Sequence, residues 1–196
     1  MTYKNELPTL LNYLKDAMNG TLNLACRWFV LRGSDNNAAE SAELLASQGI
    51  PAFTPLEYRS SQIGDEKVWE LVPCQPDLLF IYATYDAVRI EMNNKSLASF
   101  HFVYDDDGLS PINPPNDVVD NLIRIVMASI PQSYSVTDEE IHYRPGGMVE
   151  VIDGPFKGII GRVARVHTQT RVVASVPGVI AYATTYVPKH QIIITN

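Results

Sequence analysis

The sequence has few of the features that mark secreted, membrane-spanning or disulfide-stabilised proteins. None of its apolar runs approaches the ~18 residues of a membrane-spanning helix. Its first residues lack the basic stretch followed by a continuous apolar block that marks a secretory signal. Its two cysteines, Cys26 and Cys74, are too few and too isolated for a disulfide framework or a zinc site. We therefore expect a cytoplasmic protein with no membrane partner and with reduced thiols.

The sequence also lacks the side-chain arrangements that are typical of catalysis. Its four histidines show no metal-ligand spacing, and it contains neither a nucleophile elbow nor a phosphate-binding loop. The consecutive carboxylates of Asp105, Asp106 and Asp107 could bind Mg²⁺. Before Gly108, however, such a run is more typical of a solvated turn. We expect a protein that is not an enzyme and that binds no cofactor or metal ion.

Basic residues are scarce over most of the chain. Residues 142–196 hold six Lys and Arg against two acidic residues, a net charge of +4. Residues 1–141 hold nine Lys and Arg against twenty acidic residues, a net charge of −11. The whole chain carries a net charge of −7. A protein that binds nucleic acid mainly by neutralising its phosphates needs clustered Lys and Arg. Another protein is therefore the more plausible main partner, and we expect a monomeric chain with at most weak nucleic-acid contact.

Apolar periodicity predicts an α/β domain over residues 24–130. The run at residues 78–83 is continuous and apolar, which favours a central, buried strand, whereas the run at 51–58 is interrupted by proline, which favours an edge or an irregular strand. Asn116 is a suitable N-terminal cap for a helix whose inward stripe would hold Val119, Leu122, Ile123 and Val126. The predicted strands are 27–32, 51–58, 67–72, 78–83 and 100–104, and the predicted helices are 38–48, 86–94 and 116–129.

An N-terminal extension, residues 1–23, precedes this domain. Five apolar residues recur in it at helical spacing, which predicts an amphipathic helix over residues 6–18 that ends near Asn19-Gly20. They are Leu7, Leu10, Leu11, Leu14 and Met18. Such a helix could pack on its own domain or bind a partner.

The most informative stretch runs from Met148 to Val166. Valines at near-alternate positions flank Asp153-Gly154, a turn dipeptide, which predicts a β-hairpin. Phe156 should pack inward while Lys157 faces solvent, and Gly158 and Gly161 permit a bulge or a sharp bend. An ordinary hairpin with a glycine-rich turn would share these features.

The remaining C-terminal residues add short strands. Residues 131–145 lack convincing periodicity and are rich in Pro, Ser and acidic residues, which is typical of a linker. Residues 146–196 contain the hairpin and strands at 171–176, 179–186 and 191–195, divided by Pro177-Gly178 and Pro188-Lys189. Five short strands in about fifty residues favour a small SH3-like β-barrel. The predicted fold class is therefore α+β, an N-terminal α/β sandwich with an antiparallel sheet and flanking helices, followed by this barrel.

The spacing of the hairpin motif resembles the KOW motif of ribosomal proteins and of NusG-type transcription factors. Its residues are Val151, Asp153, Gly154, Phe156, Lys157, Gly158, Gly161 and Val163. A W-F-V-L strand that opens an α/β domain, at Trp28, and the stretch P-D-L-L-F-I-Y from Pro76 also resemble the NusG family, so the likeness covers residues 27–196. Asp77 stands where the family has Gly or Asn. The 26 residues before Trp28 depart from NusG proper, which favours a specialised paralogue.

The resemblance implies a function in transcription. The family's first domain, the NGN domain, binds the clamp helices of RNA polymerase and suppresses pausing, and specialised relatives serve long operons, often for surface polysaccharides. By alignment of the strands, the polymerase-binding pocket would hold Leu78, Phe80 and Tyr104, with Arg32 on its rim; simple core packing is the alternative for each. A ribosomal protein or termination factor would be a partner of the KOW domain. The alternative is that the protein has no role at the polymerase and that its KOW module binds the ribosome or RNA. The basic face of this module would then be formed by Lys157, Arg162, Arg165 and Arg171.

Overall fold

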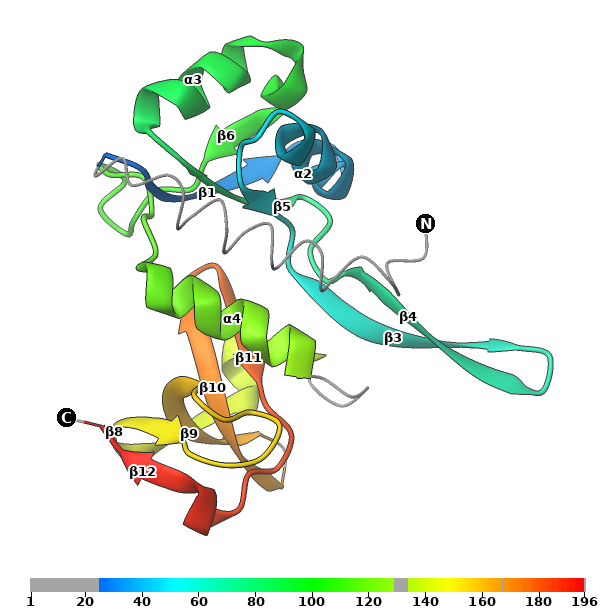
Figure 1. The fold of residues 1–196 in the computed structure, drawn as a ribbon, viewed down its shortest axis with the longest axis vertical. Helices are drawn as coiled ribbons and strands as arrows, with labels where there is room; N and C mark the ends of the chain where they lie inside the picture. Colours follow the sequence, from blue (N-terminus) through cyan, green and yellow to red (C-terminus); the bar gives the residue numbers. More distant parts are fainter. Residues whose placement is uncertain (1–24, 129–133, 167, 196) are drawn as a thin grey trace. The chain divides into compact units, whose positions relative to one another are not determined.

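The computed structural model describes residues 25–128, 134–166 and 168–195, and it shows a mixed α+β protein built on antiparallel sheets (Figure 1). The predicted helix at residues 6–18 lies outside the described residues. The chain divides into two compact units. We call residues 25–56 and 73–116 the N-terminal unit, and residues 57–72 with the described residues from 117 to 195 the C-terminal unit. Within the described ranges, no helix has both the length and the apolar character needed to cross a bilayer.

A four-stranded antiparallel sheet forms the centre of the N-terminal unit. In spatial order its strands are β2 (Ala52–Phe53), β5 (Leu78–Ala83), β1 (Arg27–Gly33) and β6 (Phe100–Phe102). All six residues of β5 are buried, as the continuous apolar run predicts for an inner strand. β2 is short and lies at the edge, which agrees with the proline interruption of this segment.

Helices pack on one face of this sheet, which we call the first face. They are α2 (Ala38–Ser47), α3 (Tyr85–Asn93) and the short 3₁₀ helix η2 (Lys95–Leu97). Thr84 caps α3, because its side-chain oxygen accepts a hydrogen bond from the Ala87 amide. The helices lie along the sheet (Figure 1), and side chains from the helices and the sheet form one apolar core. The sheet residues of this core are Phe29, Leu31, Ala52, Leu79, Ile81, Ala83, Phe100 and Phe102.

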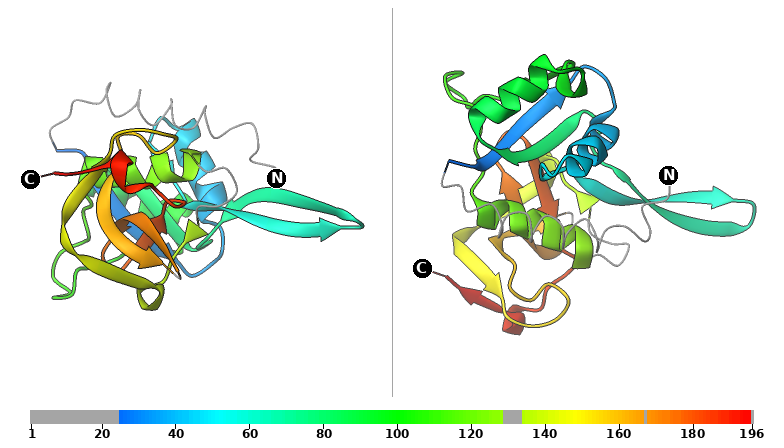
Figure 2. Two further views of the ribbon diagram at one scale, coloured as in Figure 1. Left: turned by 90° about the horizontal axis from the view of Figure 1, so that it is seen from below. Right: turned by 45° about the horizontal axis from the view of Figure 1, so that its top comes forward.

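The segment predicted as one strand at residues 51–58 is divided between two sheets. After β2, the chain passes Thr54-Pro55 and enters β3 (Leu56–Ile63), which pairs with β4 (Glu66–Pro73) in a two-stranded ribbon (Figure 2). The proline lies at this break because it cannot donate a ladder hydrogen bond. Gly64 makes the turn between β3 and β4 with a φ of 64°.

Helix α4 (Asn116–Ala128) belongs to the C-terminal unit from Asp117 onward. The apolar periodicity predicted this helix as part of the first domain. Val119 and Leu122 are buried as predicted, while Ile125 is fully buried where Val126 was expected and Val126 is half-buried. The Asn121 side chain, 6% exposed, accepts a hydrogen bond of 3.0 Å from the Ile160 amide. This bond connects α4 to the C-terminal strands. No local pattern in the sequence indicates it.

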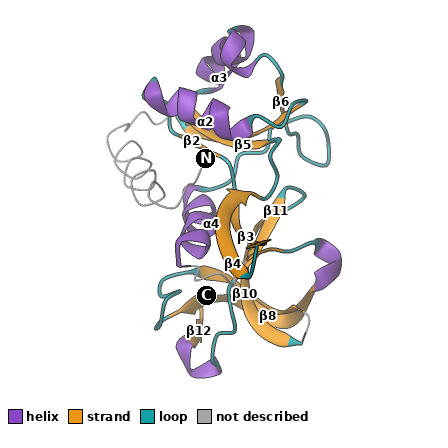
Figure 3. Cartoon of the chain, turned by 90° about the vertical axis from the view of Figure 1, so that its right-hand side faces the viewer, coloured by secondary structure: helices purple, strands orange, loops and turns teal. Residues whose placement is uncertain are grey.

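The C-terminal unit contains a six-stranded antiparallel sheet (Figure 3). Its spatial order is β12 (Ile192–Ile194), β8 (Ile141–Val151), β9 (Ile160–Val166), β10 (Gln169–Val176), β11 (Ile180–Ala183) and β7 (Tyr134–Ser135). The prediction of a closed five-stranded barrel is wrong for the described residues, because β12 and β7 are the two edges of the sheet and do not pair with each other.

The extra strand comes from the segment that the sequence analysis assigned to a linker. Within residues 131–145 the structure has β7, the 3₁₀ helix η3 (Asp138–Glu140) and the start of β8. β7 pairs with Tyr182 and Ala183 of β11, and this long-range pairing compensates for weak local periodicity. The domain boundaries predicted from the sequence remain a prediction; the structure groups residues 117–195 together from α4 onward.

Candidate binding face

The register of β1 and β5 places three of the four predicted pocket residues together. Arg32 lies directly opposite Leu78, and Val30 lies opposite Phe80. Directly opposed side chains of an antiparallel pair point to the same face of a sheet. These residues therefore lie on the face opposite α2 and α3, which we call the second face. Its residues are Trp28, Val30 and Arg32 from β1, Phe53 from β2, and Leu78, Phe80 and Tyr82 from β5.

Aromatic rings dominate the second face. Phe53 stacks on Phe80 with their ring centroids 4.9 Å apart, and Trp28 contacts both Phe53 (5.5 Å) and Tyr82 (5.4 Å). Such contacts each contribute about 0.5–1.5 kcal/mol beyond area burial. Leu78 and Phe80 have no exposed surface in this structure. They do not line an exposed pocket here, and their burial agrees with the core-packing alternative.

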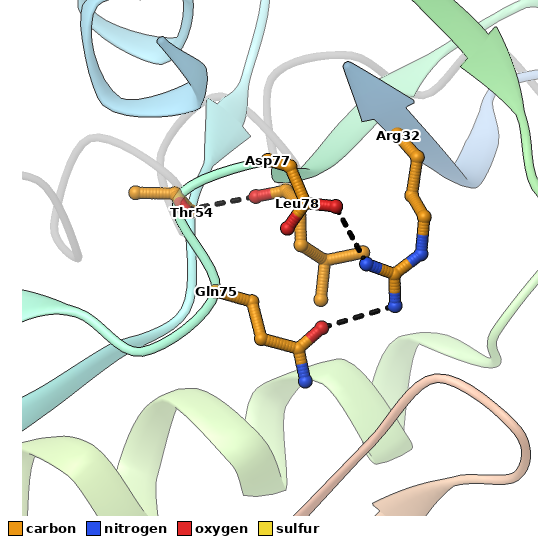
Figure 4. Close-up of polar contacts among 5 residues, drawn as sticks. All are labelled: Arg32, Thr54, Gln75, Asp77 and Leu78. Carbon is orange, nitrogen blue, oxygen red and sulfur yellow. Dashed lines mark hydrogen bonds and ion pairs between the residues drawn. The ribbon is translucent and has the colours of Figure 1, made fainter. Parts of the chain in front are cut away.

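Arg32 lies at the rim of the second face, where its side chain makes two polar contacts (Figure 4). Its guanidinium donates to Asp77 Oδ2 at 2.8 Å and to Gln75 Oε1 at 3.0 Å. The Leu78 amide donates to the Gln75 carbonyl at 3.1 Å, so Pro76 and Asp77 form a tight turn before β5. Because the two charged side chains are 34% and 31% exposed, their ion pair contributes at most ~1 kcal/mol. Its main effect is to fix the orientation of Arg32.

Sequence reasoning missed the roles of Gln75 and Asp77. It treated Asp77 only as a substitute for Gly or Asn in a turn, whereas its carboxylate also pairs with a side chain 45 residues away. Thr54 is a further contributor, since its hydroxyl donates to the Leu78 carbonyl at 2.8 Å and fixes the start of β5 (Figure 4). No periodicity could have signalled these contacts, because they join segments that are far apart in the sequence.

Tyr104, the fourth predicted pocket residue, does not lie with the other three. It follows β6, and its backbone bridges to Pro111. Its ring lies 6.5 Å from that of Phe102, a residue of the first-face core, and it is 45% exposed. Tyr85 stacks on the same Phe102 ring at 5.1 Å. Tyr104 is therefore part of an aromatic group at the other face.

The acidic run Asp105–Asp107 forms the loop after Tyr104. Asp105 Oδ1 accepts hydrogen bonds from the amides of Leu109 (3.2 Å) and Ser110 (3.4 Å), and Gly108 has a φ of 67°. One carboxylate thus closes the turn that the sequence predicted. Over the residues that the structure describes, no group of three or more His, Cys, Asp or Glu side chains is placed to hold a metal ion.

The KOW-like residues form the connection between β8 and β9. Gly154 and Gly158 have φ angles of 81° and 83°, which favour glycine. The Gly158 amide donates to the Val151 carbonyl at 2.6 Å, and the Val151 amide donates to the Ile159 carbonyl at 2.9 Å, so the loop folds back on the end of β8. Asp153 is exposed in the turn. The predicted hairpin is therefore confirmed.

The side chains of this hairpin have the predicted orientations. Phe156 is 4% exposed and Val151 is fully buried, whereas Lys157 is exposed. Gly161 is required by a close approach: a Cβ atom there would lie 2.4 Å from the Val173 carbonyl oxygen of β10. Val163 is half-buried opposite Val172. Val151, Phe156 and the three glycines thus have structural reasons that are independent of any partner.

The four basic residues of the alternative RNA-binding face differ in their surroundings. Lys157, Arg162 and Arg165 are exposed. Arg171 is half-buried, and its guanidinium donates to the Thr184 carbonyl (2.8 Å) and to Gln169 Oε1 (3.0 Å). Arg171 is therefore engaged within the sheet, which weakens the case for a continuous basic face.

No protein-family model matches the sequence, and no curated protein matches it.

Proposed function

We propose that the protein is a transcription elongation or antitermination factor of the NusG type, whose N-terminal unit binds the clamp helices of RNA polymerase and suppresses pausing or termination. A long surface-polysaccharide operon is the proposed setting. In this proposal the N-terminal unit corresponds to the NGN domain, and the β8–β9 hairpin belongs to a KOW module whose partner is a ribosomal protein or a termination factor.

The observation that carries the proposal is the conformation of the glycines in the hairpin motif. Gly154 and Gly158 adopt positive φ angles, and Gly161 allows β10 to approach. A generic glycine-rich turn needs one or two glycines, whereas here three spaced glycines are required, two for positive φ angles and one for the close approach of β10. This supports the interpretation of residues 151–163 as a KOW motif rather than as an ordinary turn.

The second face supports the proposal for the N-terminal unit. It is a contiguous apolar surface with four aromatic rings, and aromatic residues are enriched at the centres of protein interfaces. Arg32 at its rim is one-third exposed and is held in one orientation by Asp77 and Gln75. Because Leu78 and Phe80 are fully buried in the structure, a partner can reach them only when the residues that cover this face move away.

The test is binding of the intact protein to a clamp-helix fragment of RNA polymerase from the same organism, followed by transcription on a template with a strong pause. We expect Arg32→Ala to weaken clamp binding and to restore pausing. Arg89→Ala removes an exposed arginine from α3, on the first-face side, and is the matched control that should bind normally. Equal binding by both variants, or no effect of the intact protein on pausing, would refute the proposal.

A further inference from the structure

Strand β12, drawn in red in Figure 1, forms one edge of the C-terminal sheet and pairs only with β8 among the described residues. On its β8 side, the Gln191 carbonyl accepts a backbone hydrogen bond and the Thr195 amide donates one, both at 2.9 Å. Hydrogen-bonded and non-hydrogen-bonded pairs alternate along an antiparallel ladder. The backbone polar groups of Ile192 and Ile194 therefore point away from β8, toward the free side of the strand.

The free side of β12 is open to another strand. The Ile192 amide donates to the Lys189 carbonyl at the end of the 3₁₀ helix η4 (Lys189–Gln191). The Ile192 carbonyl and both backbone groups of Ile194 have no strand partner among the described residues. Natural edge strands are usually protected by charged side chains, proline or a bulge. The three residues of β12 are all isoleucine, so neither charge nor proline protects this edge.

Exposed apolar side chains gather at the same edge. Ile194 is 76% exposed and Ile193 is 44% exposed. Ile193 lies directly opposite Glu150 of β8, so it shares a face with Met148 and Ile152, which lie two positions to either side of Glu150 and are also exposed. Single exposed apolar residues are common on protein surfaces, whereas a contiguous group marks an interaction surface.

A second copy of β12 fits this edge. In an antiparallel pair centred on Ile193, each Ile193 lies beside Ile193 of the second copy, and Ile192 lies opposite Ile194. Every isoleucine of the strand then meets an isoleucine. The Ile194 amide can donate to the Ile192 carbonyl of the second copy, and two-fold symmetry repeats this bond. The pairing thus satisfies the free backbone groups and covers the most exposed side chain of the strand.

Charge does not oppose the pairing. Glu150, the acidic residue opposite Ile193, would lie three strand spacings from Glu150 of the second copy, about 14 Å. This separation exceeds the ~8 Å Debye length at physiological ionic strength, so the repulsion is largely screened.

We propose that β12 pairs in antiparallel fashion with β12 of a second copy of the chain and joins the two six-stranded sheets into one continuous sheet. Because three residues of each copy form the pair, the interface is of the small, weak class, and we expect a dissociation constant in the micromolar range or weaker. The proposal rests on the geometry of β8 and β12 and not on the proposed function.

Disulfide trapping tests the pairing at its two-fold axis. Residues of a non-hydrogen-bonded antiparallel pair have Cα atoms ~4.5 Å apart, a separation that a disulfide can bridge. In a background with Cys26→Ser and Cys74→Ser, we expect Ile193→Cys to form an intermolecular disulfide in a glutathione buffer, in which oxidised glutathione takes up the two electrons and two protons of the thiols. Met148→Cys is the matched control, because Met148 is equally exposed, 44%, but would lie about 14 Å or more from its copy. Non-reducing electrophoresis measures both variants.

Sedimentation velocity tests the association of the full chain without an added thiol. The wild-type chain should form dimers as its concentration rises. Ile194→Lys places a charge at the free edge and should raise the dissociation constant roughly tenfold or more. Ile90→Lys adds the same charge at an exposed isoleucine of α3 and should leave the constant unchanged. Circular dichroism checks that both variants remain folded, as expected for substitutions at exposed positions.

Three outcomes would overturn the proposal. The first is equal cross-linking of Ile193→Cys and Met148→Cys, which would indicate random collision. The second is association that Ile194→Lys leaves unchanged, which would place the contact on another surface. The third is a chain that stays monomeric at every concentration and does not cross-link through Ile193→Cys; the edge would then have another occupant or none.

Discussion

The close approach of β9 and β10 at Gly161 predicts a large effect of a very small substitution. In Gly161→Ala the new methyl group would lie 2.4 Å from the Val173 carbonyl oxygen and 2.9 Å from Val172 Cγ1. The nearest atom belongs to the backbone of a paired strand, so it cannot move without breaking ladder hydrogen bonds. Overpacking typically costs ~1–3 kcal/mol in the free energy of unfolding. We place this substitution at the upper end of that range.

The expected loss of ~3 kcal/mol corresponds to a fall of roughly 12–24 °C in the melting temperature of a domain of this size. Gly147→Ala is the matched control, because it lies in β8 of the same hairpin and its added Cβ would meet no heavy atom closer than 3.9 Å. Thermal unfolding followed by circular dichroism, with amide hydrogen exchange of β9 and β10, measures both variants. If Gly161→Ala melts within a degree or two of Gly147→Ala, the close approach of β9 and β10 at this position does not limit the side chain, and the reasoning is refuted.

Three further predictions follow from the described contacts. Phe80→Ala should destabilise the N-terminal unit by ~3–5 kcal/mol, because the ring is fully buried and stacks on Phe53; a urea midpoint close to that of the wild type would show that the ring is not in the core. Asn121→Ala should cost ~1–3 kcal/mol, because it leaves the Ile160 amide without its acceptor, whereas Asn121→Asp keeps an acceptor oxygen and should lose less in the same urea titration. Asp77→Ala should change stability by at most ~1 kcal/mol, because its ion pair is one-third exposed; a loss that persists in high salt would contradict a screened ion pair.

Local patterns in the sequence were sufficient for most elements and for the orientation of their side chains. Continuous burial of Leu78 to Ala83 and the break at Pro55 follow from strand composition and from the missing amide of proline. The inward Phe156 and outward Lys157 follow from the turn at Gly154. These features depend on residues close together in the chain, where backbone sterics and side-chain period act directly.

The tertiary structure alone decided which distant residues meet. Arg32 and Asp77 are 45 residues apart, and Asn121 and Ile160 are 39 apart, so no local period could pair them. Tyr104 was grouped with Leu78 and Phe80 from strand alignment, but it follows β6 beside the first-face core, because its ring packs on Phe102. The sequence by itself determined most of the elements and most of their apolar faces. Pairing between strands determined which faces are buried together, because contact energies between distant segments are absent from any local pattern.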